Sequence, residues 1–291
     1  MPTIPSAIQQ FRAYLQRRHY SPHTLESYTL DLQVFFAVSD EPLERISFRE
    51  VDRFIDIQQQ QGLSPATINR RLYALKHFFD FLNDQQLVGA IPVKPSHVLR
   101  RSRALPRALS QEQLDPLFAQ IQHPMDKALF LLMLRCGLRV SEVVQLTLKD
   151  IDWSQQAVLV EQGKGRKDRW VYLSADAVAS LRVCLAQRPS GVPGDAVFWN
   201  QKRPSRSLSV KAIQKKMARY AKAAGIVASC HSLRHTFASN LLEQGAEIVS
   251  IRELQGHASI SSSERYAKAS NQKVTQEYLR TMKKVLQRSK V

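Results

Sequence analysis

The stretch KALFLLMLRCGLRVSE, residues 127–142, contains the longest apolar run of the chain and a glycine directly after it. Ala128 to Leu134 is apolar without interruption, which is too short for a membrane span and has the length of a buried helix segment. A helix that is apolar on all sides belongs in the centre of a core. We therefore predict a buried helix over Lys127–Cys136 that ends near Gly137.

The sequence after this helix alternates between strand and helix patterns. Ala157 to Glu161 and Arg169 to Leu173 are short strand-like runs joined by Gly163-Lys164-Gly165-Arg166-Lys167, which predicts a β-hairpin. Helical periodicity or a helix cap marks the remaining predicted helices, which start after Ser110 and cover residues 208–224, 232–244, 248–254 and 272–287. The second part of the chain is thus expected to be mostly helical with a small antiparallel sheet.

The first hundred residues show helical periodicity only, which predicts a bundle of four or five helices. Three helix starts carry cap signals, namely Ser21-Pro22, Ser47 with Glu50, and Ser64-Pro65. Tyr14, Tyr28 and Tyr73 lie on apolar helix faces and are expected in the core. Together, the two parts predict a mainly α (α+β) fold.

A proline-rich basic segment, residues 89–108, separates the two parts. Pro92, Pro95 and Pro106 alternate there with three arginines, Arg100, Arg101 and Arg103. This composition is typical of an interdomain linker that lies along a phosphate backbone. The alternative is a solvated loop whose charge is incidental.

The chain is strongly basic, with 42 Lys and Arg against 25 Asp and Glu and a formal net charge of +17. Residues 1–108 hold 14 basic and 10 acidic residues, so most of the excess lies in the remainder. Such a field attracts polyanions, and nucleic acid is the leading partner, with ribosomal RNA or an anionic membrane surface as alternatives. No signal peptide or membrane span is evident, so we expect a cytoplasmic protein. The cysteines Cys136, Cys184 and Cys230 show no metal-binding spacing and are expected to be reduced and buried.

Five segments of the second part carry candidate chemistry, namely GLRVSE (137–142), GKG (163–165), HSLRH (231–235), GH (256–257) and Tyr266. Each alone is common, but in this order and at this spacing they resemble the tyrosine recombinase (phage integrase) family, especially its compact Xer-like members. The resemblance covers most of the chain. It implies a helical core-binding (SAM-like) DNA-binding domain over 1–88, a linker over 89–108 and a catalytic domain over 109–291. The sequence departs from the usual family wording at Gln255, where leucine is common, and at Ser261 to Ser263, where threonine is common.

The resemblance implies that Arg139 and Arg234 bind the scissile phosphate. Arginine suits this role because its planar fork donates to two phosphate oxygens and stays charged. Glu142 lies three residues after Arg139 and is expected to orient it, whereas a plain salt bridge is the alternative for an isolated pair. By the same resemblance His257 donates to the phosphate, and His231 is the general base or acid. His235 is left as a structural residue.

Tyr266, nine residues after His257, is the implied nucleophile that forms a 3′-phosphotyrosyl bond. Lys164 is the candidate general acid for the leaving 5′ oxygen, with Lys167 as its main rival. Arg166, Lys167 and Arg169 are expected at backbone phosphates. No P-loop and no carboxylate cluster for magnesium is evident, so neither ATP nor a metal is expected as a cofactor.

The expected partner is double-stranded DNA with an inverted-repeat core site, bound by a homotetramer or by a hetero-tetramer with a paralogue. Candidate base-reading residues lie on two helices and are Asn69, Arg70, Arg71, Lys76, Lys211 and Lys215. The apolar stripe of helix 272–287, which includes Tyr278, docks either on a neighbouring subunit or on its own domain. Two rival functions stay open: a type IB topoisomerase that relaxes supercoils, and an architectural protein that only binds DNA.

Overall fold

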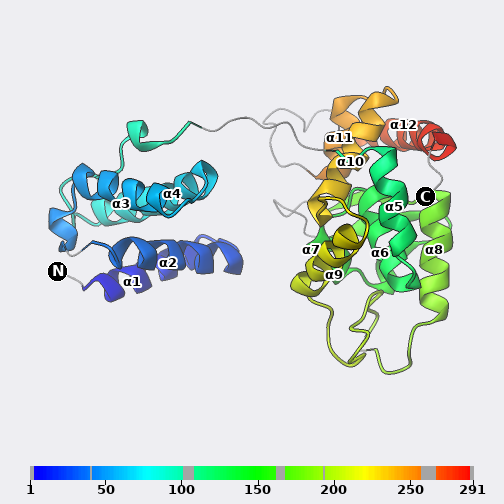
Figure 1. The fold of residues 1–291 in the computed structure, drawn as a ribbon, viewed down its shortest axis with the longest axis horizontal. Coiled ribbons are helices and arrows are strands. Elements are labelled where there is room, and N and C mark those ends of the chain that lie inside the picture. The colour runs from blue at the N-terminus through cyan, green and yellow to red at the C-terminus, as the bar shows by residue number, and fades with distance from the viewer. Residues whose placement is uncertain are drawn as a thin grey trace. The chain divides into compact units, whose positions relative to one another are not determined.

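The computed structural model describes residues 3–39, 41–100, 108–161, 168–192, 194–256 and 267–288, with side chains from 275 to 287 in the last range. The chain folds into two compact units, Met1–Ala104 and Leu105–Val291 (Figure 1). Each unit has its own hydrophobic core. Both units are mainly helical, which confirms the predicted fold class. Within the described ranges, the only sheet lies in the second unit.

The first unit is a four-helix bundle, and its second, third and fourth helices begin where the cap signals predict. The helices are α1 (Ile4–Arg17), α2 (Pro22–Phe36), α3 (Phe48–Gln60) and α4 (Pro65–Asp84), with short 3-10 turns at Leu43–Arg45 and Pro95–His97. The hydroxyls of Ser21 and Ser64 accept backbone N–H groups of their own first turns. At α3, the Ser47 N–H donates to Glu50 Oε2 at 2.7 Å. These bonds satisfy backbone donors that a helix start leaves unpaired.

Aromatic rings fill the core of the first unit. Phe11, Phe35, Phe54 and Phe78 are almost completely buried, and the rings of Phe11 and Phe78 meet edge to face at 5.4 Å between centroids. The prediction for Tyr73 was wrong, because its side chain is 57% exposed. Leu72, Leu75, Phe78, Phe79 and Leu82 form the buried face of α4, and position 73 falls outside that stripe.

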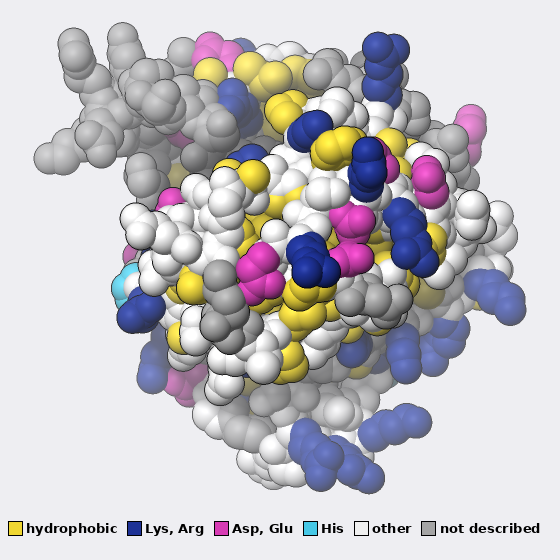
Figure 2. Space-filling model, turned by 90° about the vertical axis from the view of Figure 1, so that its left-hand side faces the viewer, with side chains coloured by type: hydrophobic (Ala, Val, Ile, Leu, Met, Phe, Trp, Pro, Cys, Tyr) yellow, Lys and Arg dark blue, Asp and Glu magenta, His cyan; other side chains and the backbone are white. Residues whose placement is uncertain are grey.

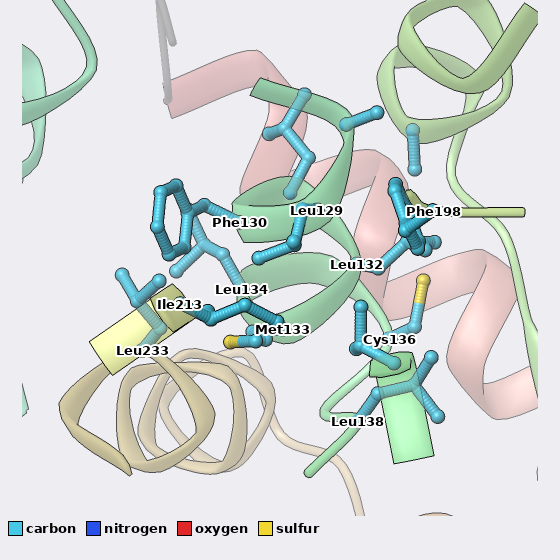
Figure 3. Packing of buried hydrophobic residues seen from close by; sticks show 14 of the residues in the cluster. Leu129, Phe130, Leu132, Met133, Leu134, Cys136, Leu138, Phe198, Ile213 and Leu233 are labelled. Atoms are coloured by element: carbon cyan, nitrogen blue, oxygen red, sulfur yellow. The ribbon is translucent and has the colours of Figure 1, made fainter. Parts of the chain in front are cut away.

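The second unit is built around α6 (Pro124–Arg135), which confirms the predicted buried helix. The side chains of Leu129 to Leu134 are at most 1% exposed, so this helix is surrounded on all sides (Figure 3). It packs against α7 (Val140–Gln145), α8 (Ala175–Ala186) and α10 (Cys230–Glu243). The other helices of the unit are α5 (Gln111–Gln120), α9 (Val210–Ala223), α11 (Ile248–Gln255) and α12 (Ala267–Arg288). The three cysteines are free and buried, as expected.

The predicted hairpin is present as β2 (Ala157–Val160) and β3 (Arg169–Tyr172), which pair antiparallel from Ala157↔Tyr172 to Val160↔Arg169. A two-residue strand, β1 (Ile151–Asp152), adds to the edge of β2 and gives the order β1-β2-β3. The connection from 162 to 167, with Lys164, Arg166 and Lys167, lies outside the described residues. The sheet brings Arg169, the first residue of β3, to within hydrogen-bond distance of Glu142 and of the last turn of α11.

The terminal helix α12 packs against its own unit. Tyr278, Met282 and Val285 are buried in a small cluster with Phe237 of α10 and Leu254 of α11. The Tyr278 hydroxyl donates to the backbone carbonyl of Arg135 at 3.0 Å. Of the two alternatives for this apolar stripe, the structure therefore has the one in which it covers its own domain.

Candidate active site

The first arginine of the predicted pair is placed by a sharp exit from α6. Gly137 adopts a left-handed φ of +66°, and Arg139 is the N-cap of α7. Glu142 lies at the third position of α7 and accepts the backbone N–H of Arg139 at 2.7 Å. The same carboxylate accepts Nη1 of the Arg139 side chain at 2.6 Å. The GLRVSE segment thus forms a capping box in which both the backbone and the side chain of Arg139 donate to Glu142.

The second arginine and His231 come from the first turn of α10. Ser229 caps this helix, so His231 and Arg234 lie one turn apart on the same side of it. Both side chains line a pocket of about 490 Å³ together with Arg139. Its other walls come from Leu138, Val140, Ser141, Gln214, Ala218, Ala228, Ser229 and Cys230. The structure therefore brings three of the six predicted catalytic residues to one pocket.

Arg234 is held deeply by backbone carbonyls. Its side chain is 5% exposed, and its Nη1 and Nη2 donate to the carbonyl oxygens of Gly137 and Gln255. Burial, reinforced by the charge of Arg139, lowers the pKa of Arg234 to about 9, which still leaves the guanidinium charged at neutral pH. Glu142 Oε2 lies 3.8 Å from Arg234 Nη1. A single carboxylate therefore faces the guanidinium groups of both predicted phosphate-binding arginines.

His231 lies at the exposed edge of the pocket and can act as a proton acceptor. Burial, with the charges of His235, Arg234 and Arg139, lowers the pKa of the His231 imidazole below its ordinary 6.5. The ring of the half-buried His235 meets it edge to face at 4.2 Å between centroids. At neutral pH the His231 imidazole is therefore neutral, the form that a general base requires.

Arg169 was predicted to contact a backbone phosphate because it follows a basic turn, but its side chain points into the unit. Instead of facing solvent for a phosphate contact, its side chain is 10% exposed and forms two hydrogen bonds to Glu142, at 3.0 and 2.8 Å.

Gln255, which was assigned no role from the sequence, donates from Nε2 to the backbone carbonyl of Arg234 at 3.1 Å. Its only sequence signal was a polar residue at a position where the family commonly has leucine.

Three predicted catalytic residues, Lys164, His257 and Tyr266, lie outside the described residues, as do the linker arginines Arg101 and Arg103. The segment with His257 and Tyr266 is bracketed by Gly256, the left-handed C-cap of α11, and by Ala267, the first residue of α12.

The predicted base-reading residues of α4 are all engaged within the first unit. The Asn69 amide exchanges two hydrogen bonds with the backbone of Leu99, at 2.8 and 2.9 Å. Arg70 and Arg71 pair with the buried Asp31 of α2, and Lys76 pairs with Asp80 at 2.8 Å. On the face in Figure 2, basic side chains lie among acidic and hydrophobic ones, without one continuous basic patch among the described residues.

Other predicted DNA contacts are accessible. Arg100 is exposed at the end of the described part of the first unit. Lys211 and Lys215 are exposed on α9, each three residues before a pocket-lining residue, Gln214 and Ala218 respectively. Three-residue spacing places each lysine beside the corresponding pocket residue, on the helix surface next to the arginines and His231.

Comparison with known proteins agrees with this fold. Residues 107–273 match the phage integrase family, and residues 8–86 match the phage integrase N-terminal SAM-like domain. The chain belongs to the phage integrase family of tyrosine recombinases, which carry out site-specific DNA recombination.

Among its relatives, the tyrosine recombinase XerC of Bacillus subtilis is 30% identical over 96% of this chain and 97% of its own length. Tyrosine recombinase XerA of Thermococcus kodakarensis is 32% identical over 94% of this chain and 92% of its own. In fold, the chain is similar to a lambda integrase dimer bound to a core site, with a TM-score of 0.73, 18% identity, and coverage of 89% of this chain and 96% of that one. No described helix is long and apolar enough to cross a membrane.

Proposed function

We propose that this chain cleaves and rejoins one DNA strand at a time through a transient 3′-phosphotyrosyl bond to Tyr266. The Tyr266 oxygen attacks the scissile phosphorus, and the 5′ oxygen leaves with a proton. The new ester retains the energy of the broken bond, so the 5′ hydroxyl of another strand can reverse the reaction without ATP.

The observation that carries this proposal is that Arg139 and Arg234 line one pocket together with a neutral His231. Negative charge builds on the nonbridging oxygens of the transition state, and fixed donors aimed at that charge are commonly the largest catalytic contribution. His231 takes the phenolic proton as general base. Lys164 is assigned the proton transfer to the leaving oxygen, and His257 a further hydrogen bond to the phosphate.

We further propose how the chain is divided and assembled. Residues 1–88 form the core-binding domain, 89–108 the linker and 109–291 the catalytic domain. Strand exchange takes place between two short inverted-repeat sites in a tetramer, made of one chain or of this chain and a paralogue. Lambda integrase, which shares the fold, has been crystallised as a tetramer bound to a Holliday junction.

A nicked suicide duplex carrying the target site tests the chemistry, because the fragment after the nick diffuses away and traps the covalent product. The wild-type protein is expected to form an adduct that survives denaturing electrophoresis, and Tyr266→Phe to form none. Tyr278→Phe is a matched control, since it also removes one phenol from the same unit. An adduct that persists in Tyr266→Phe would assign the nucleophile to another residue. Relaxed circles without exchanged segments would identify a topoisomerase instead.

A further inference from the structure

Arg169 is placed to act on the active site although its side chain does not line the pocket. It is the first residue of β3, yet its three donor nitrogens all point into the unit. Nη1 and Nη2 donate to Glu142 Oε1 and Oε2 at 3.0 and 2.8 Å, and Nε donates to the carbonyl of Leu254 at 2.8 Å. One guanidinium thus joins β3, α7 and the last turn of α11.

The same guanidinium lies against the turn that ends α11. A Cβ added at Gly256 would come within 3.0 Å of Arg169 Nη1 and 3.1 Å of its Cδ. Gly256 also has a φ of +59°, so the chain turns there in a left-handed conformation directly against Arg169. The position of this turn therefore depends on Arg169 as well as on the backbone of α11.

These contacts matter because Arg139 is oriented by two anchors. Its Nη1 donates to Glu142 Oε1 at 2.6 Å, and its Nη2 donates to the carbonyl of Gly256 at 3.0 Å. Arg169 contacts both anchors, the carboxylate through two hydrogen bonds and Gly256 through close packing. Although burial alone would raise the pKa of Glu142, hydrogen bonds and charge from Arg169, with the hydrogen bonds from Arg139, lower it. Glu142 is therefore ionised and able to bind both arginines at neutral pH.

We propose that Arg169 is a positioning residue for the cleavage step, which holds Glu142 and the Gly256 turn at the spacing that aims Arg139 at the scissile phosphate. This role rests on the proposed function. Lysine cannot replace it fully, because one ammonium cannot span both carboxylate oxygens and the Leu254 carbonyl as a planar fork does.

The test compares single-turnover cleavage of the nicked suicide duplex with equilibrium affinity for an uncleavable duplex of the same sequence. Arg169→Met is expected to cleave about 100-fold more slowly, as misplacement of a catalytic group by about 1 Å can do. Its affinity for DNA should stay within about threefold of wild type, because all three nitrogens of the Arg169 side chain are already bonded inside the unit. Arg169→Lys, which keeps the charge, should cleave about tenfold more slowly.

A double-mutant cycle with Glu142→Gln separates positioning from general stabilisation. If Arg169 acts through Glu142, the double variant cleaves no more than about threefold more slowly than the slower single variant. Arg188→Met is the control, since Arg188 is likewise bonded to backbone carbonyls, those of Ala196 and Gly194, but lies outside the pocket lining. It should cleave at the wild-type rate, and thermal unfolding monitors the fold of every variant.

Three results would overturn the inference. The first is that Arg169→Met cleaves at the wild-type rate, and the second is that the double variant loses the product of the two single-variant losses in cleavage rate. The third is that Arg169→Met loses DNA affinity and cleavage rate to the same extent, with a weaker salt dependence of DNA binding. The last would make Arg169 a phosphate contact. Failure of the proposed function looks different, because the wild-type protein itself would then form no adduct.

Discussion

At the scale of single residues, Gly137 sets the direction in which the chain leaves α6 toward Arg139 and the pocket. A Cβ built there would lie 2.4 Å from Cδ1 of the buried Phe237 ring, at a φ of +66°. Gly225 has a similar φ of +70° with nothing within 4 Å of an added Cβ, so it is a matched control. We predict that Gly137→Ala lowers the free energy of unfolding by about 1–3 kcal/mol more than Gly225→Ala. Urea denaturation measures this difference, and equal losses in the two variants would contradict it.

His231 gives a prediction in terms of pH. An imidazole can act as a general base only when it is neutral. Because the pKa of His231 is lowered from its ordinary 6.5, the imidazole is neutral at pH 6.5 and above. The cleavage rate is therefore expected to rise with pH in a limb that lies below pH 6.5, and to lose this limb in His231→Gln. His235→Gln removes one of the causes of the lowered pKa and should move the limb to higher pH. A limb above pH 6.5 in the wild type, or one unchanged in His231→Gln, would refute the assignment.

At the scale of elements, α12 contributes to the stability of the unit that it covers. The Tyr278 hydroxyl donates to the carbonyl of Arg135 inside the protein, so Tyr278→Phe is predicted to lower the free energy of unfolding by about 1–2 kcal/mol. Leu279→Ala, at an exposed position of the same helix, should change it by less than about 0.5 kcal/mol. Chemical denaturation distinguishes the two, and equal effects would mean that α12 does not hold the core.

The same packing predicts what happens when α12 is removed. If α12 only docked on a neighbouring subunit, removing it would leave DNA binding nearly intact. Because Phe237 and Leu254 are buried beneath it, a chain ending before Gln272 exposes part of the core instead. We therefore expect truncation to weaken folding and DNA binding along with recombination.

Elements with strong local signals could be predicted from the sequence. The α6 run, the serine caps and the hairpin each depend on neighbours a few residues apart, and all are present. The helix α8 was not predicted because its periodicity is weak, with Val183 51% exposed. Strand β1 has only two residues, so it carries no periodicity at all.

In the site, three-residue spacing places Glu142 beside Arg139 and His231 beside Arg234, whereas the shared role of the two arginines was predicted from the family resemblance. The position of Arg169 could not, since its partners Glu142 and Leu254 are 27 and 85 residues away. Local sequence showed only an arginine beside a basic turn, for which a phosphate contact was the simplest interpretation. The ion pairs of Arg70 and Arg71 with Asp31 were missed for the same reason, because Asp31 lies 39 residues before Arg70.

At the scale of the whole molecule, each unit has its own core, and every hydrophobic cluster among the described residues belongs to a single unit. We predict that a fragment of residues 1–100 and a fragment of residues 105–291 each unfold cooperatively on their own. Circular dichroism during urea titration measures this. The second fragment should also show the steeper salt dependence of DNA binding, because it carries most of the excess positive charge. A non-cooperative transition in either fragment would contradict the proposed division.

The arginine cluster also has a thermodynamic consequence for the whole protein. In the described part of the chain, Glu142 is the one carboxylate paired with Arg139, Arg169 and Arg234, so three positive charges share one negative charge beside the pocket. A phosphate that enters this pocket is a missing counter-ion and relieves the repulsion among the guanidinium groups. Because the unfolded chain lacks this arrangement of arginines, DNA is expected to bind the folded state more tightly, and the difference in binding free energy adds to the resistance of the second unit to unfolding.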